Sequence, residues 1–107
     1  MTYNSSATDQ YMLSVLVDEF SVDEADNALT ALSTLTSAYP QLFPSERTFA
    51  RPDHQLGVNG PAGVRFVVFG EEGIVRVIRL PRAVLTSLRN TINELFLILV
   101  ATYKLAA

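Results

Sequence analysis

The chain has 107 residues, of which 49% are hydrophobic and 18% charged, and its formal net charge is −3. This composition is typical of one small soluble domain, and the length is sufficient to bury a modest core. The absence of cysteine excludes a disulfide scaffold and a cysteine nucleophile, and a single histidine excludes any site built on two imidazoles. The sequence contains no recognisable catalytic motif, so we expect a protein that is not an enzyme and has no cofactor.

The N-terminal ten residues contain no basic residue and no apolar stretch, so they do not form a secretory signal. We expect a disordered tail over 1–10 and a single domain over 11–107. The longest apolar run, Leu95 to Ala101, is much shorter than the roughly 20 residues that a membrane-spanning helix needs. The sequence therefore predicts a cytoplasmic protein that does not contact a membrane.

Charge is distributed unevenly along the chain. Residues 1–46 hold seven acids and no base, whereas residues 47–107 hold eight bases and four acids. In one interpretation, acidic N-terminal elements pack beside arginine-bearing ones and neutralise them. In the other, the surface is bipolar and docks head-to-tail or onto charged partners.

The segment 11–20 suits either a strand or a helix, because its apolar residues alternate and also recur at helical spacing. Asp18 and Glu19 at its end would oppose the negative C-terminal end of a helix dipole. We therefore predict a strand, which a right-handed crossover would place beside the hairpin described below.

A helix start signal follows this segment. Ser21 and Glu24 have the spacing of a capping box, in which each side chain binds the backbone N–H of the other residue. Alanine and leucine then recur at helical spacing until Pro40 ends the pattern, which predicts a helix over 22–38.

Residues 40–63 hold four of the five prolines and three of the five glycines. A connection of this length without structure is unusual in a compact domain. Either the alternating segment 47–51 forms a short strand, or 40–63 is a functional or mobile loop.

The strongest local pattern is a β-hairpin over 64–80, in which two β-branched runs flank the turn Gly70–Gly73. Two glutamates between the glycines favour a turn with Gly73 at positive φ. The register that this turn imposes pairs Arg65 with Arg79, Val67 with Val77, and Phe69 with Val75. Both faces of the hairpin are largely apolar, so we expect both to be covered.

The remainder of the chain predicts one long helix over 82–105. The predicted fold is therefore α+β, with a small antiparallel hairpin sheet, possibly of three strands, packed against an N-terminal helix and a long C-terminal helix.

Four arginines on or just after the hairpin are candidate anion-binding residues: Arg65, Arg76, Arg79 and Arg82. Like charges opposed across two strands are unfavourable unless an anion lies between them. A carboxylate from 18–26 would satisfy these arginines within the chain, whereas a phosphate or a partner's acid would make them a binding site. Net acidity and the absence of lysine clusters make nucleic acid an unlikely partner.

Asp53 and His54 are the only neighbours from which an acid–base pair could start. A lone histidine in a proline-rich loop is typically a solvated surface residue, and nothing nearby supplies further metal ligands, so we expect neither catalysis nor a metal here.

Residues 64–83, VRFVVFGEEGIVRVIRLPRA, resemble the terminal hairpin of small bacterial toxins of the ParE/RelE type. The basic surface that such toxins usually carry is missing, and the long apolar C-terminal helix departs from their pattern. The resemblance therefore implies no functional residue for this chain.

The C-terminal helix is apolar on all sides around Leu95–Val100, which exceeds what one small sheet can cover. We therefore predict a homodimer through this helix. Its predicted partner-binding residues are Leu88, Ile92, Leu95, Phe96, Leu99 and Tyr103. The predicted function is a non-enzymatic protein–protein interaction module, such as a small adaptor, chaperone, regulator or immunity-type protein, whose partners are itself and another protein. The alternative is an anion- or nucleic-acid-binding domain that uses the four arginines.

Overall fold

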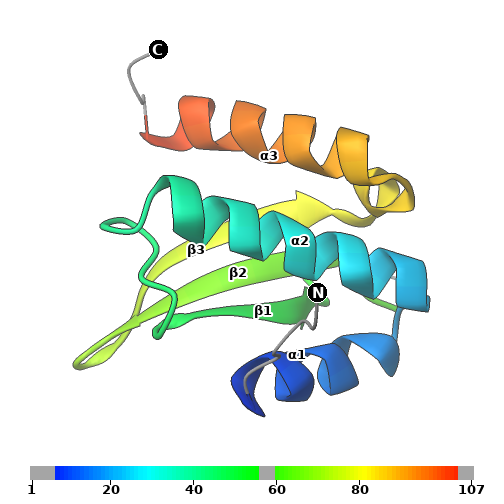
Figure 1. Ribbon diagram of the computed structural model, residues 1–107, viewed down its shortest axis with the longest axis horizontal. Helices are drawn as coiled ribbons and strands as arrows, with labels where there is room; N and C mark the ends of the chain where they lie inside the picture. Colours follow the sequence, from blue (N-terminus) through cyan, green and yellow to red (C-terminus); the bar gives the residue numbers. More distant parts are fainter. Residues whose placement is uncertain (1–6, 56–59, 104–107) are drawn as a thin grey trace, which may run out of the picture.

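The computed structural model describes residues 7–55 and 60–103, and it has the predicted α+β fold (Figure 1). In chain order the elements are α1 (Ala7–Val17), α2 (Val22–Ala38), β1 (Thr48–Asp53), β2 (Gly63–Gly70), β3 (Gly73–Pro81), the 3₁₀ helix η1 (Arg82–Thr86) and α3 (Leu88–Tyr103). The strands form one antiparallel sheet in the order β1-β2-β3. Helix α2 crosses in front of the sheet in Figure 1, with α1 near β1 and α3 near β3.

The strand that we predicted over 11–20 is wrong, because this segment lies in helix α1 and the turn after it. Met12 and Leu16, one helical turn apart, are 3% and 0% exposed, and both belong to the core. The two acids that argued against a helix lie beyond its last residue, Val17, so the dipole argument did not apply. Helix α1 also includes residues 7–10 of the expected tail, while residues 1–6 lie outside the described residues.

The prediction of a helix over 22–38 is confirmed, and so is its cap. The backbone N–H of Glu24 donates to Ser21 Oγ at 3.1 Å, and the N–H of Ser21 donates to Glu24 Oε1 at 3.0 Å. The buried face of α2 consists largely of small side chains, which let the helix lie close to its neighbours: Ala25, Ala28, Ala31, Leu32 and Leu35.

The third strand of the sheet is β1, which comes from the proline-rich segment 40–63 and corresponds to the short strand at 47–51, one of the two alternatives that the sequence left open. The crossover that would have placed 11–20 in the sheet is therefore wrong. In the hairpin, the predicted pairs Arg65–Arg79 and Val67–Val77 are confirmed. Phe69 pairs with Ile74 instead of Val75, because Val75 is an extra residue that forms a bulge in β3. Gly73 has the expected positive φ, 132°.

The sheet has one face in the core and one face away from it. The core includes strand residues whose side chains all point to the same face of the sheet: Ala50, Val64, Phe66, Val68, Ile78 and Leu80. Val67 and Val77 point to the opposite face and are outside this core cluster. We expected both faces to be covered: the core cluster lies on one face, while on the other Val67 is 2% exposed and Tyr11 of α1 contacts Arg51.

The single helix predicted over 82–105 is wrong, because the chain breaks at Ser87. Ser87 is extended, with φ −144° and ψ 141°, and its Oγ accepts a hydrogen bond from the N–H of Asn90 at 3.2 Å. Two partly buried hydrogen bonds stabilise the break: Asn27 Nδ2 donates to the carbonyl oxygen of Leu85 at 2.7 Å, and the Thr91 hydroxyl donates to the carbonyl oxygen of Val84. Side chains therefore satisfy carbonyls that a continuous helix would bond itself.

Candidate functional site

The most unusual feature of the sheet is a row of three arginines on its open face. Arg51, Arg65 and Arg79 are direct cross-strand partners, one on each strand. Directly opposed residues of antiparallel strands have Cα atoms about 4.5–5.5 Å apart. The row therefore brings three guanidinium groups of like charge onto one small surface.

A second row, two residues along each strand, is apolar. Phe49, Val67 and Val77 are cross-strand partners on the same face as the arginines. Val67 is 2% exposed, whereas Phe49 and Val77 are half-buried. The ring of Phe69 lies edge-to-face against Phe49, with 5.7 Å between the ring centres. The open face is therefore amphipathic, with a basic stripe beside an apolar stripe.

The described residues compensate the charge of this row only in part. Arg79 Nε lies 3.2 Å from Asp53 Oδ2, and this carboxylate is 8% exposed. Arg51 donates to the hydroxyl of Tyr11 at 3.3 Å and stacks over its ring, which supplies no full negative charge. The Nε atom of Arg65 is buried and has no hydrogen-bond partner in the described part of the chain. An orphaned buried donor is costly, and more so when it is charged.

The other two predicted arginines lie elsewhere. Arg76 faces the helices, where it donates to the carbonyl of Leu42 at 3.3 Å. Arg82 forms a two-pronged ion pair with Glu24, at 3.0 and 3.2 Å, and stacks over the ring of Phe20. This hydrogen bond from Arg82 holds the pKa of Glu24 below its ordinary value. A carboxylate from 18–26 thus satisfies Arg82, while Asp53 is the partner of Arg79.

Asp53 and His54 do not form an acid–base pair. His54 Nε2 lies 2.9 Å from Glu19 Oε2, and the histidine side chain is 57% exposed. Asp53 instead accepts the N–H of Gln55 at 3.1 Å and contacts Arg79. Gln55 also accepts a hydrogen bond from Arg79, so Asp53 and Gln55 orient this arginine rather than the histidine.

The structure divides the predicted partner-binding residues of α3 between core and surface. Leu95 and Leu99 are each 2% exposed and belong to the core. Tyr103 packs edge-to-face on Phe43, and burial raises its pKa. The outer side of α3 nevertheless exposes large apolar side chains, which we call the α3 outer face: Phe96 at 55%, Leu97 at 61% and Val100 at 37%, with half-buried Ile92 beside them. Leu88, 44% exposed, begins the helix on the same stripe as Leu95 and Leu99 and is not part of this face.

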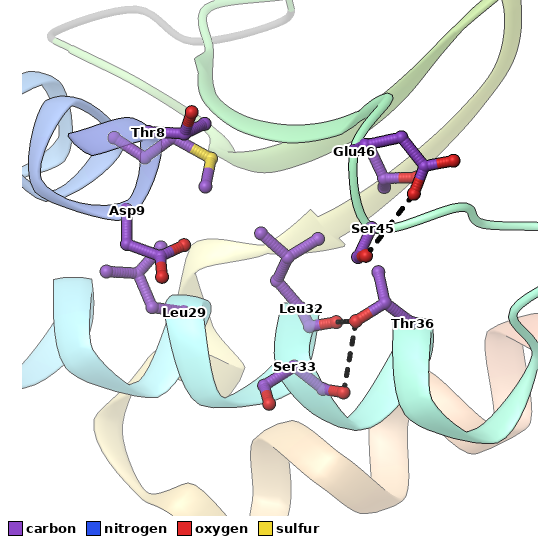
Figure 2. Close-up of a pocket in the computed structure, with 10 residues that line it drawn as sticks. Thr8, Asp9, Leu29, Leu32, Ser33, Thr36, Ser45 and Glu46 are labelled. Carbon is purple, nitrogen blue, oxygen red and sulfur yellow. Dashed lines mark hydrogen bonds between the residues drawn. The ribbon is translucent and has the colours of Figure 1, made fainter. Parts of the chain in front are cut away.

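A cleft of about 490 Å³ opens between α1, α2 and the segment before β1 (Figure 2). Its rim carries the carboxylates of Asp9 and Glu46 together with several hydroxyl groups. Thr36 donates to backbone carbonyls of its own helix, and Ser45 donates to Glu46 at 3.5 Å, as Figure 2 shows. The hydroxyl groups of Thr36 and Ser45 are therefore both engaged by groups close to them in the sequence.

The described residues contain no group of three or more histidine, cysteine, aspartate or glutamate side chains that could hold a metal ion. Within 7–55 and 60–103, none of the helices has the length and apolar character of a membrane span.

The fold and its two surfaces define a small α+β domain, in which a helical layer covers one face of a three-stranded antiparallel meander. Comparisons with protein-family models, curated proteins and solved structures find no match to this chain.

Sequence reasoning missed two residues of the open face, Arg51 and Phe49. The alternation over 47–51 placed both on one side of a short strand, which was the available signal. It did not show that this strand pairs with β2, and only that pairing aligns Arg51 with Arg65.

Proposed function

We propose that this protein is a non-enzymatic interaction module that self-associates through the α3 outer face. The observation that carries the proposal is the exposure of Phe96, Leu97 and Val100 on one side of α3. Exposed apolar side chains gathered on one element mark interaction surfaces in soluble proteins. The proposal takes the cytoplasm as the place of action, in keeping with a fold that uses no disulfide.

The charge distribution supports a second copy of the chain as the occupant of this surface. The only charged residues of α3 are Arg89 and Glu94, and the helix carries none from Leu95 to Tyr103. Two copies of this face can therefore meet about a twofold axis without like charges coming together. The arginine row, by contrast, would repel its own copy.

Molar mass measured by light scattering over a hundredfold dilution series tests the proposal. We expect a dimer that dissociates on dilution, and we expect Phe96→Glu to give a monomer at every concentration. Val22→Glu is the matched control, because Val22 is 63% exposed but lies on α2. A wild-type protein that is monomeric throughout, or a Phe96→Glu variant that dimerises like the wild type, would overturn the proposal.

A further inference from the structure

We propose that the open face of the sheet binds an extended acidic segment of a partner polypeptide. Its carboxylates would lie on Arg51, Arg65 and Arg79, and an apolar side chain of the same segment would lie on the row Phe49–Val67–Val77. This surface is separate from the α3 outer face, so the inference does not depend on self-association.

The first argument is unbalanced charge. The row has three guanidinium groups but, within the described residues, one carboxylate, that of Asp53. Of the three arginines, this carboxylate forms an ion pair with Arg79. Like charges directly opposed across strands destabilise a sheet. Two further carboxylates would offset the repulsion, so binding an acidic ligand is favoured by the charges that the fold brings together.

The second argument is the state of Arg65. This residue is in the centre of the row and has neighbours of like charge on both sides. Its Nε is buried without an acceptor in the described residues, although a guanidinium presents donors that match a carboxylate in pairs. Arg65 as a whole is only half-buried, and a carboxylate placed over the row would supply beside its guanidinium the negative charge that the described residues do not provide.

The third argument is spacing. Neighbouring positions in the row are separated by about 5 Å. In an extended peptide, side chains on the same side recur at about 6.6–6.8 Å, and the long arginine stems can adjust to the difference. Acidic residues two apart would therefore contact two neighbouring arginines, and an apolar residue two positions beyond them, on the same side of the peptide, would be available to the adjacent apolar row.

A peptide agrees with the charges better than a nucleic acid does. Arg79 already holds a carboxylate within the fold, at 3.2 Å, so this face demonstrably accommodates that group. The chain has a net charge of −3, and all charged residues up to residue 46 are acidic, so a polyanion with a charge on every nucleotide is repelled more strongly than a short segment with two carboxylates. The apolar row offers a contact for a hydrophobic side chain, which a phosphate backbone would leave unused.

Fluorescence anisotropy with a labelled model peptide tests the inference. The probe is an extended peptide with two glutamates two residues apart and a leucine two positions beyond each, so that these four side chains lie on one side of the peptide. A peptide with glutamine in place of glutamate and a single-stranded polyuridine RNA are the comparison ligands. The measurements use the full chain at low ionic strength, in the wild type and in the Phe96→Glu background, so that loss of dimerisation and loss of peptide binding are distinguished.

We expect the glutamate peptide to bind and Arg65→Gln to weaken its binding about tenfold or more, the usual effect of losing a charge-assisted hydrogen-bond pair. Arg51→Gln provides a second variant if Arg65→Gln unfolds. Arg89→Gln, which removes an exposed arginine on α3, should leave the affinity unchanged. Absence of binding, equal binding of the glutamine peptide, an effect of Arg89→Gln as large as that of Arg65→Gln, or preferred binding of the RNA would overturn the inference.

Discussion

Arg82 and Glu24 are 58 residues apart in the sequence, and their two-pronged ion pair joins the start of η1 to the first turn of α2. The same carboxylate forms the capping box with Ser21. One side chain thus stabilises both the start of a helix and its contact with the segment that leads into α3. The Glu24 side chain is 15% exposed and the Arg82 side chain 41% exposed, so water screens this pair in part.

This pair predicts a loss of stability in acid. The pKa of Glu24 in the folded protein lies below its ordinary value of 4.5, so its stabilising effect is complete above that pH. It is lost as the pH falls through the folded pKa. Glu24→Gln, which retains a capping-box side chain, should flatten the decline in unfolding free energy below about pH 5 and cost about 1 kcal/mol at pH 7.

Urea denaturation as a function of pH measures this effect. Arg82→Gln should flatten the same part of the curve, and the double variant should lose no more than the larger of the two single changes. If the two effects simply add, the ion pair is not the cause of the acid sensitivity.

The division of α3 into a buried and an exposed side predicts opposite results at adjacent positions. Leu95→Ala should destabilise the fold by about 2–5 kcal/mol, because it leaves a cavity in the core. Phe96→Ala, although it removes a larger side chain, should change the stability of the monomer by about 0.5 kcal/mol or less. Chemical denaturation at a protein concentration low enough for the chain to be monomeric compares the two variants. Equal losses of unfolding free energy would contradict the orientation of α3.

Thr91 should be important for the break between η1 and α3. Its hydroxyl is 0% exposed and lies within hydrogen-bond distance of the carbonyls of Val84 and Ser87. Thr91→Val keeps the shape but leaves the Val84 carbonyl without its described partner, which should cost about 1–3 kcal/mol. Thr91→Ser, measured in parallel by thermal unfolding, should recover most of this loss; a serine variant as unstable as the valine variant would show that the methyl group matters instead.

Close backbone packing predicts that Gly63 is intolerant of any side chain. A Cβ atom at this position would overlap the carbonyl oxygen of Leu80 on β3 and lie 3.0 Å from the N atom of Arg82. At Gly70 it would meet chiefly the Val75 side chain, which can move. We expect Gly63→Ala to cost about 3 kcal/mol and Gly70→Ala about 1 kcal/mol in denaturant unfolding. The reverse order would be inconsistent with the register of β2 and β3.

The parts of the fold that sequence predicted correctly depend on local interactions. The capping box spans four residues, and the hairpin register follows from a short turn. The helix over 22–38 and the pair Arg65–Arg79 could therefore be predicted from the sequence. Helix α1 could not, because its apolar spacing suits two periods. Its helical form buries Met12 and Leu16 against distant parts of the chain, and the N–H of Ala50, on β1, donates to the sulfur of Met12 at 3.2 Å.

The candidate surfaces were predictable to a similar extent. The short turn between β2 and β3 was enough to predict that Arg65 pairs with Arg79. The pairing of Arg51 with Arg65 was not predictable, because β1 and β2 are joined by an irregular segment that does not fix their register. The apolar excess of the C-terminal helix was visible in sequence, but its division was not. Which leucines are buried depends on the angle at which α3 meets α2, and the break at Ser87 sets where α3 begins.

The alternation of the strands has a consequence for how the chain avoids misfolding. A shift of β1 by one residue against β2 would turn Arg51 toward the helices and Ala50 toward water. The misaligned sheet would then bury a guanidinium without a carboxylate, a large cost against the stability of a domain of this size. The charge of Arg51 therefore also favours the observed alignment of β1, in which this arginine lies away from the core.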